Sequence, residues 1–141
     1  MAYIDVKHVS KIYGSGEQEV RANDDINFEI KKGELTIIVG ASGAGKSTLL
    51  NILGGMDTPT KGDVIVNDRN IATYSPKQLT TYRRLSVGFV FQFYNLIPNL
   101  TALENVELAS QISPDSLDVP EVMKDVGLAK RTNNFPAQLS G

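Results

Sequence analysis

The strongest chemical signal in the sequence is the stretch GASGAGKST at residues 40 to 48. It has the spacing G-x-x-x-x-G-K-[ST], in which closely wound glycine backbone aims successive N–H groups at phosphate oxygens. Lys46 adds a mobile positive charge for the β and γ phosphates, and the Ser47 hydroxyl is a hard oxygen ligand for Mg²⁺. The alternative is a loop that joins a strand to a helix and binds nothing. The residues predicted to bind a nucleoside triphosphate are Gly40, Ser42, Gly43, Ala44, Gly45, Lys46, Ser47 and Thr48.

Hydrolysis of a bound nucleotide needs two further groups: an Asp that holds Mg²⁺ at the end of a neighbouring strand, and a group that activates water. The only apolar run with a carboxylate after it is VIVND, which ends at Asp68. The turn-like residues that follow favour a hairpin here over a metal-binding strand end. A small-molecule kinase is disfavoured, because Arg83 and Arg84 alone do not make its Arg-rich lid. The sequence thus predicts a phosphate cradle without a convincing metal carboxylate or water-activating base.

Strands and helices alternate around this loop. The apolar run 35–39 predicts a strand buried on both faces of a parallel sheet, 47–53 predicts the helix after the loop, and 87–91 predicts a further apolar strand. Strands are also expected at 2–13, 20–30 and 62–68. Capping patterns at Ser75 and Thr101 open helices to Arg84 and Ser110, and a short helix is expected within 117–126. Strands give way to helices, which indicates an α/β fold followed by an α segment.

Composition excludes several classes of protein. Fourteen Lys and Arg against sixteen Asp and Glu give a net charge of −2, and no basic block suits a nucleic-acid backbone. Cysteine is absent from the sequence, which excludes disulfides and thiol chemistry. The one histidine, His8, is expected to be a half-exposed strand residue rather than a ligand or base. No stretch approaches the roughly 18 apolar residues of a membrane-spanning helix, so we expect a cytosolic protein that meets a membrane only through a partner.

Three motifs in order resemble the ATP-binding subunit of ABC transporters: GASGAGKST at 40–48, FVFQFYNLIPNLTALENV at 89–106 and QLSG at 138–141. Within that family the chain is similar to the lipoprotein-releasing and the macrolide or antimicrobial-peptide exporter ATPases. The resemblance implies an α/β fold: a RecA-like P-loop NTPase core with an antiparallel β subdomain and the start of an α-helical subdomain. It implies an ATP-binding core at 1–92, a helical subdomain at 93–141, and ATP and Mg²⁺ as cofactors.

The resemblance also gives roles to residues outside the phosphate loop. Tyr13 matches the aromatic residue that stacks on adenine, with an ordinary strand tyrosine as the alternative. Gln92 matches the glutamine that contacts Mg²⁺ or the attacking water, so Ser47 and Gln92 are the implied metal ligands. The segment 94–100 is implied to face the transporter's membrane subunit, with a buried loop as the alternative.

The implied assembly is a pair of ATPase subunits around two ATP molecules, bound to a permease subunit at the inner face of the cell membrane. In the family, QLSG continues into a signature motif, L-S-G-G-Q, and the Mg²⁺-binding Asp, the catalytic Glu and the switch His follow it. We therefore expect a chain that is cut inside this signature and binds ATP without hydrolysing it. The alternative is a natural short module that binds nucleotide or permease. A cut would expose an apolar sheet edge, which predicts self-association. The residues that match the first part of the signature, which contacts the second subunit's ATP, are Leu139, Ser140 and Gly141.

Overall fold

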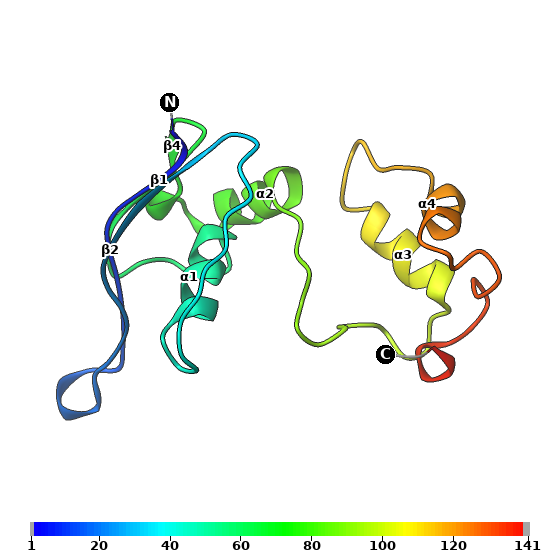
Figure 1. The fold of residues 1–141 in the computed structure, drawn as a ribbon, viewed down its shortest axis with the longest axis horizontal. Helices are drawn as coiled ribbons and strands as arrows, with labels where there is room; N and C mark the ends of the chain where they lie inside the picture. The colour runs from blue at the N-terminus through cyan, green and yellow to red at the C-terminus, as the bar shows by residue number, and fades with distance from the viewer. Residues whose placement is uncertain (1, 140–141) are drawn as a thin grey trace. The chain divides into compact units, whose positions relative to one another are not determined.

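The computed structural model describes residues 2–139, which belong to two compact units, Met1–Gly88 and Phe89–Gly141 (Figure 1). The first unit contains an antiparallel sheet and the helices α1 and α2. The second contains the helices α3 and α4. The functional division into an ATP-binding core at 1–92 and a helical subdomain at 93–141 stays a prediction.

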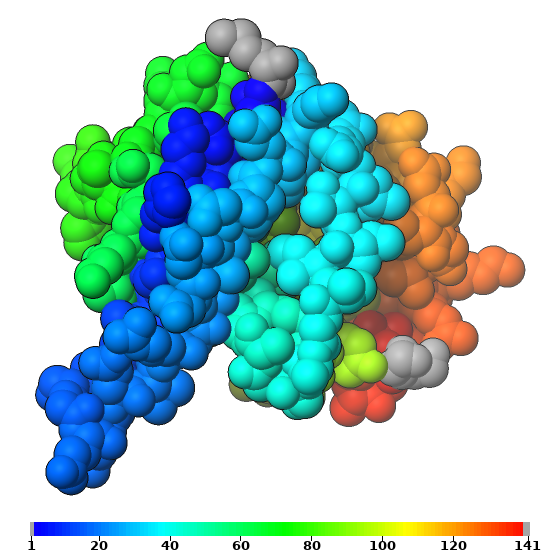
Figure 2. Space-filling view, turned by 60° about the vertical axis from the view of Figure 1, so that its left-hand side comes forward, coloured from blue at the N-terminus to red at the C-terminus, as the bar shows by residue number. Residues whose placement is uncertain are grey.

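The first unit is built on four antiparallel strands in the order β2-β1-β3-β4. Their bounds are β1 Ala2–Tyr13, β2 Val20–Lys31, β3 Lys61–Val66 and β4 Arg69–Asn70. β1 and β2 form a long hairpin, and its tip, with the 3₁₀ turn Gly16–Gln18, projects from the rest of the unit (Figure 2). Asn67 and Asp68 join β3 to β4, and both have the positive φ of a tight hairpin turn. The first two predicted strands are therefore confirmed, and 62–68 is the hairpin that the sequence favoured.

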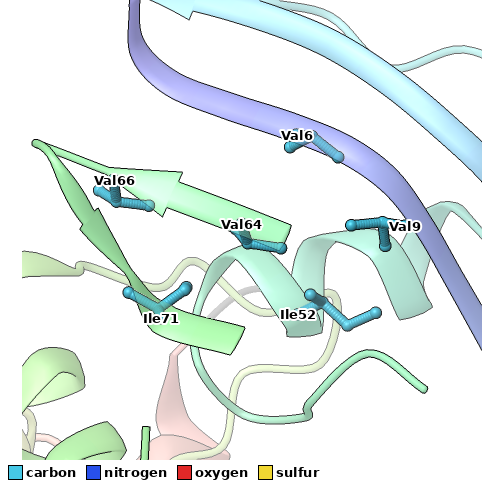
Figure 3. Close-up of a cluster of buried hydrophobic side chains, with 6 residues drawn as sticks. All are labelled: Val6, Val9, Ile52, Val64, Val66 and Ile71. Atoms are coloured by element: carbon cyan, nitrogen blue, oxygen red, sulfur yellow. The ribbon is translucent and has the colours of Figure 1, made fainter. Parts of the chain in front are cut away.

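The core of the first unit lies between this sheet and α1, which spans Lys46–Leu53. Val6 of β1 lies directly opposite Val64 of β3, so the two strands present apolar side chains to the same side. Burial of one such side chain contributes about 1.5–3 kcal/mol, and the cluster therefore fixes the helix against the strands. The six buried side chains that converge there are Val6, Val9, Ile52, Val64, Val66 and Ile71 (Figure 3).

Both helices of the first unit follow the signals in the sequence. α1 ends at Gly54 and Gly55, and Gly55 has a positive φ of 71° and packs against the Tyr82 ring. The 3₁₀ turn Ile71–Thr73 leads toward α2, which spans Pro76–Ser86. At its start the Gln78 N–H donates to the Ser75 Oγ (3.3 Å), and the Ser75 N–H donates to the Gln78 Oε1 (2.8 Å). This reciprocal cap confirms the predicted helix start.

The segments 35–39 and 87–91 are not strands, and the predictions for them are wrong. Leu35, Ile37 and Val39 are 89%, 76% and 83% exposed, and the segment that holds them runs over the surface of the first unit (Figure 2, cyan). An apolar β-branched run becomes a strand only when a neighbouring strand supplies hydrogen-bond partners. Among residues 2–139 no strand pairs with either segment, so the expected parallel sheet is absent from this part of the chain.

The second unit confirms the two remaining helix predictions. α3 spans Ala102–Ser110, and α4 spans Val119–Asp125 before a turn at Gly127, whose φ is 78°. The Glu104 N–H donates to the Thr101 Oγ1 (3.2 Å), and the Thr101 N–H donates to the Glu104 Oε2 (2.7 Å), which is the predicted cap.

The start of α3 is also held by residues much later in the chain. The N–H groups of Ala102 and Leu103 donate to the carbonyls of Asn134 (2.8 Å) and Thr132 (3.0 Å). The 3₁₀ turn Pro136–Gln138 follows. These contacts close a small core, whose residues are Ala102, Val119 and Met123 with Leu103, Val106, Leu128 and Leu139 packed against them.

Candidate phosphate and base site

The loop at residues 40–45 winds tightly before it enters α1. The Ala44 N–H donates to the Ala41 carbonyl (3.2 Å), and Gly43 between them has a φ of 78° that few other residues adopt. Gly45 is the N-cap of α1 with a φ of 82°, and no side chain among the described residues caps this helix. Its first N–H groups therefore point out of the helix without a side-chain acceptor, which is an arrangement that suits an anion.

Gly45 lies so close to β2 that only glycine fits. A Cβ at this position would lie 1.9 Å from the Ala22 carbonyl oxygen. The Gly45 carbonyl accepts from the Leu49 N–H (2.9 Å) and from the Asn23 Nδ2 (3.1 Å). Because the peptide is planar and trans, a fixed carbonyl also fixes the opposite direction of the Lys46 N–H. The strand β2 thus orients one donor of the phosphate cradle.

Asn23 was not predicted from the sequence as a site residue, because it is one polar residue among several in a strand. Its side chain is buried, and its Oδ1 is the one buried side-chain polar atom without a hydrogen-bond partner among the residues that the structure describes. An unpaired buried acceptor costs free energy. The hydrogen bond to Gly45 is thus made at a cost to stability.

The Lys46 ammonium lies at the mouth of the loop, where it donates to the carbonyls of Gly40 (2.8 Å) and Ala41. Phosphate oxygens are stronger acceptors than these carbonyls, because they are charged. Ser47 and Thr48 occupy the first turn of α1, and the Ser47 side chain is exposed. The structure thus brings the predicted loop residues 40–48 together at the start of one helix.

Tyr13 lies at the end of β1, and the residue is 43% exposed. Its hydroxyl donates to the Asp57 Oδ2 (2.8 Å), and the Lys11 ammonium lies 5.0 Å from the ring centroid. Lys11 also pairs with the Asp57 Oδ1 (2.6 Å). Sequence reasoning missed both Lys11 and Asp57, because 46 residues separate the two and neither belongs to a recognised motif.

The environment of Asp57 favours its ionised form. Burial raises the pKa of this carboxyl, but the hydrogen bonds from Lys11, Tyr13 and the Thr58 N–H outweigh that effect, so its pKa lies below the ordinary value. The carboxylate is therefore a lasting acceptor for the tyrosine hydroxyl near neutral pH.

The remaining predicted site residues lie in the second unit. Gln92 is exposed in the irregular segment that precedes α3. Leu139 packs against the small core around Met123, and Ser140 and Gly141 lie outside the described residues. The exposed segment at 93–97 leads into a loop that Asn105 holds, because the Asn105 Nδ2 donates to the carbonyls of Ile97, Leu100 and Thr101.

Several other groups are accounted for without a catalytic role. Asp68 lies in the β3–β4 turn and not at the end of a strand beside the loop. The His8 Nδ1 contacts the Asp25 Oδ1 (2.7 Å) across the β1–β2 hairpin, and both side chains are exposed. Within residues 2–139 no group of three or more His, Cys, Asp or Glu side chains is placed to hold a metal ion. No helix in the same range is long and apolar enough to cross a membrane.

Comparison with known proteins gives consistent matches. Residues 23–141 match the family model for the ABC transporter. The chain is 40% identical over 143 residues to the lipoprotein-releasing system ATP-binding protein LolD of Bordetella pertussis. The alignment covers 98% of this chain and 62% of that protein. It is 41% identical over 143 residues to the macrolide export ATP-binding/permease protein MacB of Hyphomonas neptunium, across 98% of this chain and 22% of MacB.

A solved structure shows the same fold. It is the dimeric, post-hydrolysis state of an ATP-binding cassette bound to ADP and Pi, with a TM-score of 0.86 and 40% identity. The match covers 97% of this chain and 63% of the cassette. The predicted fold class, a P-loop NTPase with an antiparallel β subdomain, is therefore confirmed, and the chain spans rather more than 60% of the length of LolD and of this cassette.

Proposed function

The chain belongs to the ABC transporter family of ATP-binding domains, and from this premise we propose that its loop at residues 40–48 binds ATP together with Mg²⁺. The observation that carries the proposal is the start of α1. Gly43 and Gly45 have positive φ, the helix begins without a side-chain cap, and Lys46 has its ammonium at the loop mouth. Converging N–H groups, the positive end of a helix dipole and a lysine together suit a triphosphate.

The proposed roles of the single residues follow from their chemistry. The ammonium of Lys46 exchanges the carbonyls of Gly40 and Ala41 for β- and γ-phosphate oxygens, because charged acceptors bind it more strongly. The exposed Ser47 hydroxyl is the proposed Mg²⁺ ligand, and Thr48 is a further phosphate donor. The Tyr13 ring is the proposed platform for adenine. The accessory role of Gln92 stays a prediction.

We expect this chain to bind ATP and not to hydrolyse it by itself. This part of the proposal has two supports. The resemblance implies a Mg²⁺-binding Asp and a catalytic Glu after the signature match at 139–141, and the chain spans only 62% of LolD. Asp68, the one carboxylate that the sequence offered instead, lies in a hairpin turn. Coupling of hydrolysis to transport is then a property of the whole protein.

The proposed partners are a second ATP-binding subunit and a permease subunit at the inner face of the membrane. The similar cassette of known structure is dimeric, and MacB is by its name both ATP-binding and permease protein. Apolar side chains gather in the segment before α3, where Phe93 and Tyr94 are 75% and 73% exposed. A surface of this kind suits docking to another protein. The proposed contact of Leu139, Ser140 and Gly141 with the second subunit's ATP stays a prediction.

Isothermal titration with Mg²⁺ and ATP tests the proposal. Lys46→Ala should weaken ATP binding by about 10- to 100-fold, because hydrogen bonds to charged groups are worth about 1.5–3 kcal/mol. Lys32→Ala, which removes an exposed lysine in the turn after β2, is the matched control. Gln92→Ala should leave the ATP affinity of this chain nearly unchanged. Equal affinity in the wild type and the Lys46 variant would overturn the phosphate assignment. Phosphate release that depends on Lys46 would overturn the binding-only part.

A further inference from the structure

Asp57 gathers three donors at one carboxylate. The Lys11 Nζ lies 2.6 Å from Oδ1, the Thr58 N–H donates to Oδ1 at 2.8 Å, and the Tyr13 hydroxyl donates to Oδ2 at 2.8 Å. The Lys11 Nζ also donates to the Thr58 carbonyl (2.7 Å). Both ends of the Tyr13 phenol are therefore defined: the strand β1 fixes its backbone, and a rigidly held carboxylate fixes its hydroxyl.

The two faces of the Tyr13 ring have different neighbours. The Lys11 ammonium lies over the ring at 5.0 Å from its centroid, and the Lys11 side chain is only 13% exposed. A cation held over one face attracts the ring and occupies that face. The Tyr13 residue as a whole is nevertheless 43% exposed. Lys11 occupies one side of the ring, so the exposed part of the residue suits a flat partner on the other side.

The same cluster is joined to the phosphate loop by two routes. Along the first, Lys11 lies directly opposite Asn23 in the β1–β2 ladder, and the Asn23 side chain holds the Gly45 carbonyl. Along the second, the N–H of Asp57 donates to the carbonyl of Asn51 near the end of α1, the helix that the loop opens. The carboxylate and the cradle are therefore fixed to one strand pair and one helix.

We propose that Lys11 and Asp57 are positioning residues that hold the Tyr13 ring as a one-faced platform for the base of the bound nucleotide. The inference rests on the proposed function, since it requires a nucleotide in the loop. It goes further because it concerns the affinity that the base adds, which is the difference in affinity between ATP and a bare triphosphate. The inference assigns part of this difference to two residues outside every recognised motif. An aromatic ring that is already held in place loses little entropy when a base stacks on it.

The competing view is that the Lys11–Asp57 pair only joins the sheet to the end of α1. The two views differ in what a substitution does to ligands with and without a base. A purely structural pair supports the loop and the ring alike, so its loss weakens ATP and inorganic tripolyphosphate together. A positioning pair weakens ATP and leaves tripolyphosphate almost unchanged.

The test is the titration of the full chain with Mg²⁺–ATP and with Mg²⁺–tripolyphosphate. Asp57→Asn and Tyr13→Phe should each weaken ATP binding by about 3- to 10-fold, the worth of one ordinary hydrogen bond, and should change tripolyphosphate binding by less than about twofold. Tyr13→Phe removes only the hydroxyl that donates to Asp57 and keeps the ring, so it tests the inference even if Asp57→Asn disturbs folding. Lys7→Met is the matched control, because it breaks the Lys7–Asp5 pair (2.8 Å) on the same strand.

Each outcome decides the question. An equal loss for both ligands, or no loss for either in Tyr13→Phe and Asp57→Asn, would overturn the inference. Wild-type chain that binds tripolyphosphate as tightly as ATP would also overturn it, while the phosphate site would stand. Wild-type chain that binds neither ligand would overturn the proposed function itself, and the inference with it.

Discussion

Substitution of the two positive-φ glycines of the phosphate loop by alanine should have clearly unequal effects. Gly43 and Gly45 have nearly the same φ, 78° and 82°, so alanine at either position carries a similar backbone strain of about 1–2 kcal/mol. Their surroundings differ. A Cβ added at Gly43 meets nothing within 4 Å, whereas a Cβ at Gly45 lies 1.9 Å from the Ala22 carbonyl oxygen. Gly43→Ala is therefore a matched control for Gly45→Ala.

The magnitude follows from the contacts that the loop must give up. To accommodate the new Cβ, the Gly45 carbonyl has to move away from β2, which breaks its hydrogen bonds with the Asn23 Nδ2 and the Leu49 N–H. Each is worth about 1 kcal/mol, so the total for Gly45→Ala is about 3–4 kcal/mol against about 1–2 for Gly43→Ala. We also expect Gly45→Ala to abolish measurable ATP binding, since the Lys46 N–H turns with the carbonyl.

Urea unfolding followed by tyrosine fluorescence measures the difference. Four of the five tyrosines, at positions 3, 13, 74 and 82, lie in the first unit, so the signal reports mainly on that unit. Equal losses of unfolding free energy in the two variants would refute the reasoning, because the close approach of β2 to the loop would then contribute nothing to stability.

Three further outcomes are expected. Asn23→Leu removes a buried unpaired oxygen that costs about 1–3 kcal/mol and one hydrogen bond worth about 1, so the unfolding free energy should stay level or rise by up to about 2 kcal/mol. A loss of more than about 1 kcal/mol in the unfolding free energy measured with urea would contradict this balance. Because the pKa of Asp57 is lowered in the fold, its contribution to stability is complete above the ordinary carboxyl pKa and is lost as pH falls through the folded-state value, below about pH 4. The unfolding midpoint of Asp57→Asn should then depend less on pH in that range than the midpoint of the wild type. Parallel pH profiles of the two proteins would contradict this contribution of Asp57. The exposed apolar segment 35–39 should make the chain associate as its concentration rises, and light scattering of a monodisperse monomer at high concentration would argue otherwise.

Local signals in the sequence predicted local structure well. The two reciprocal caps at Ser75 and Thr101 each depend on residues three positions apart, and both helices begin where those residues indicate. The hairpin at Asp68 and the turn at Gly127 were also visible, because positive φ restricts the choice of residue at such turns. The phosphate loop was found for the same reason, since its glycines and Lys46 are spaced within one stretch.

Contacts between residues far apart in the chain could not be predicted from the sequence. The apolar composition of 35–39 favours burial. Whether the segment becomes a strand depends on partner strands elsewhere in the chain, and residues 2–139 supply none. The contact of Asn23 with Gly45 spans 22 residues, and that of Lys11 with Asp57 spans 46. Nothing in the types or spacing of these four residues connects them, so the structure alone identifies the groups that hold the loop and the tyrosine.

The hydrogen bonds between the start of α3 and residues 132–134 bear on the order in which the protein acquires structure during synthesis. The ribosome delivers the chain from its N-terminus, and a unit closes only when all of its contacts have emerged. The sheet of the first unit is complete once Asn70 has been made. The first amide groups of α3 must wait for Thr132 and Asn134, some 30 residues later, and the small core waits for Leu139. A released chain that ends before residue 130 should therefore carry a protease-resistant sheet followed by an α3 segment that is still open to cleavage.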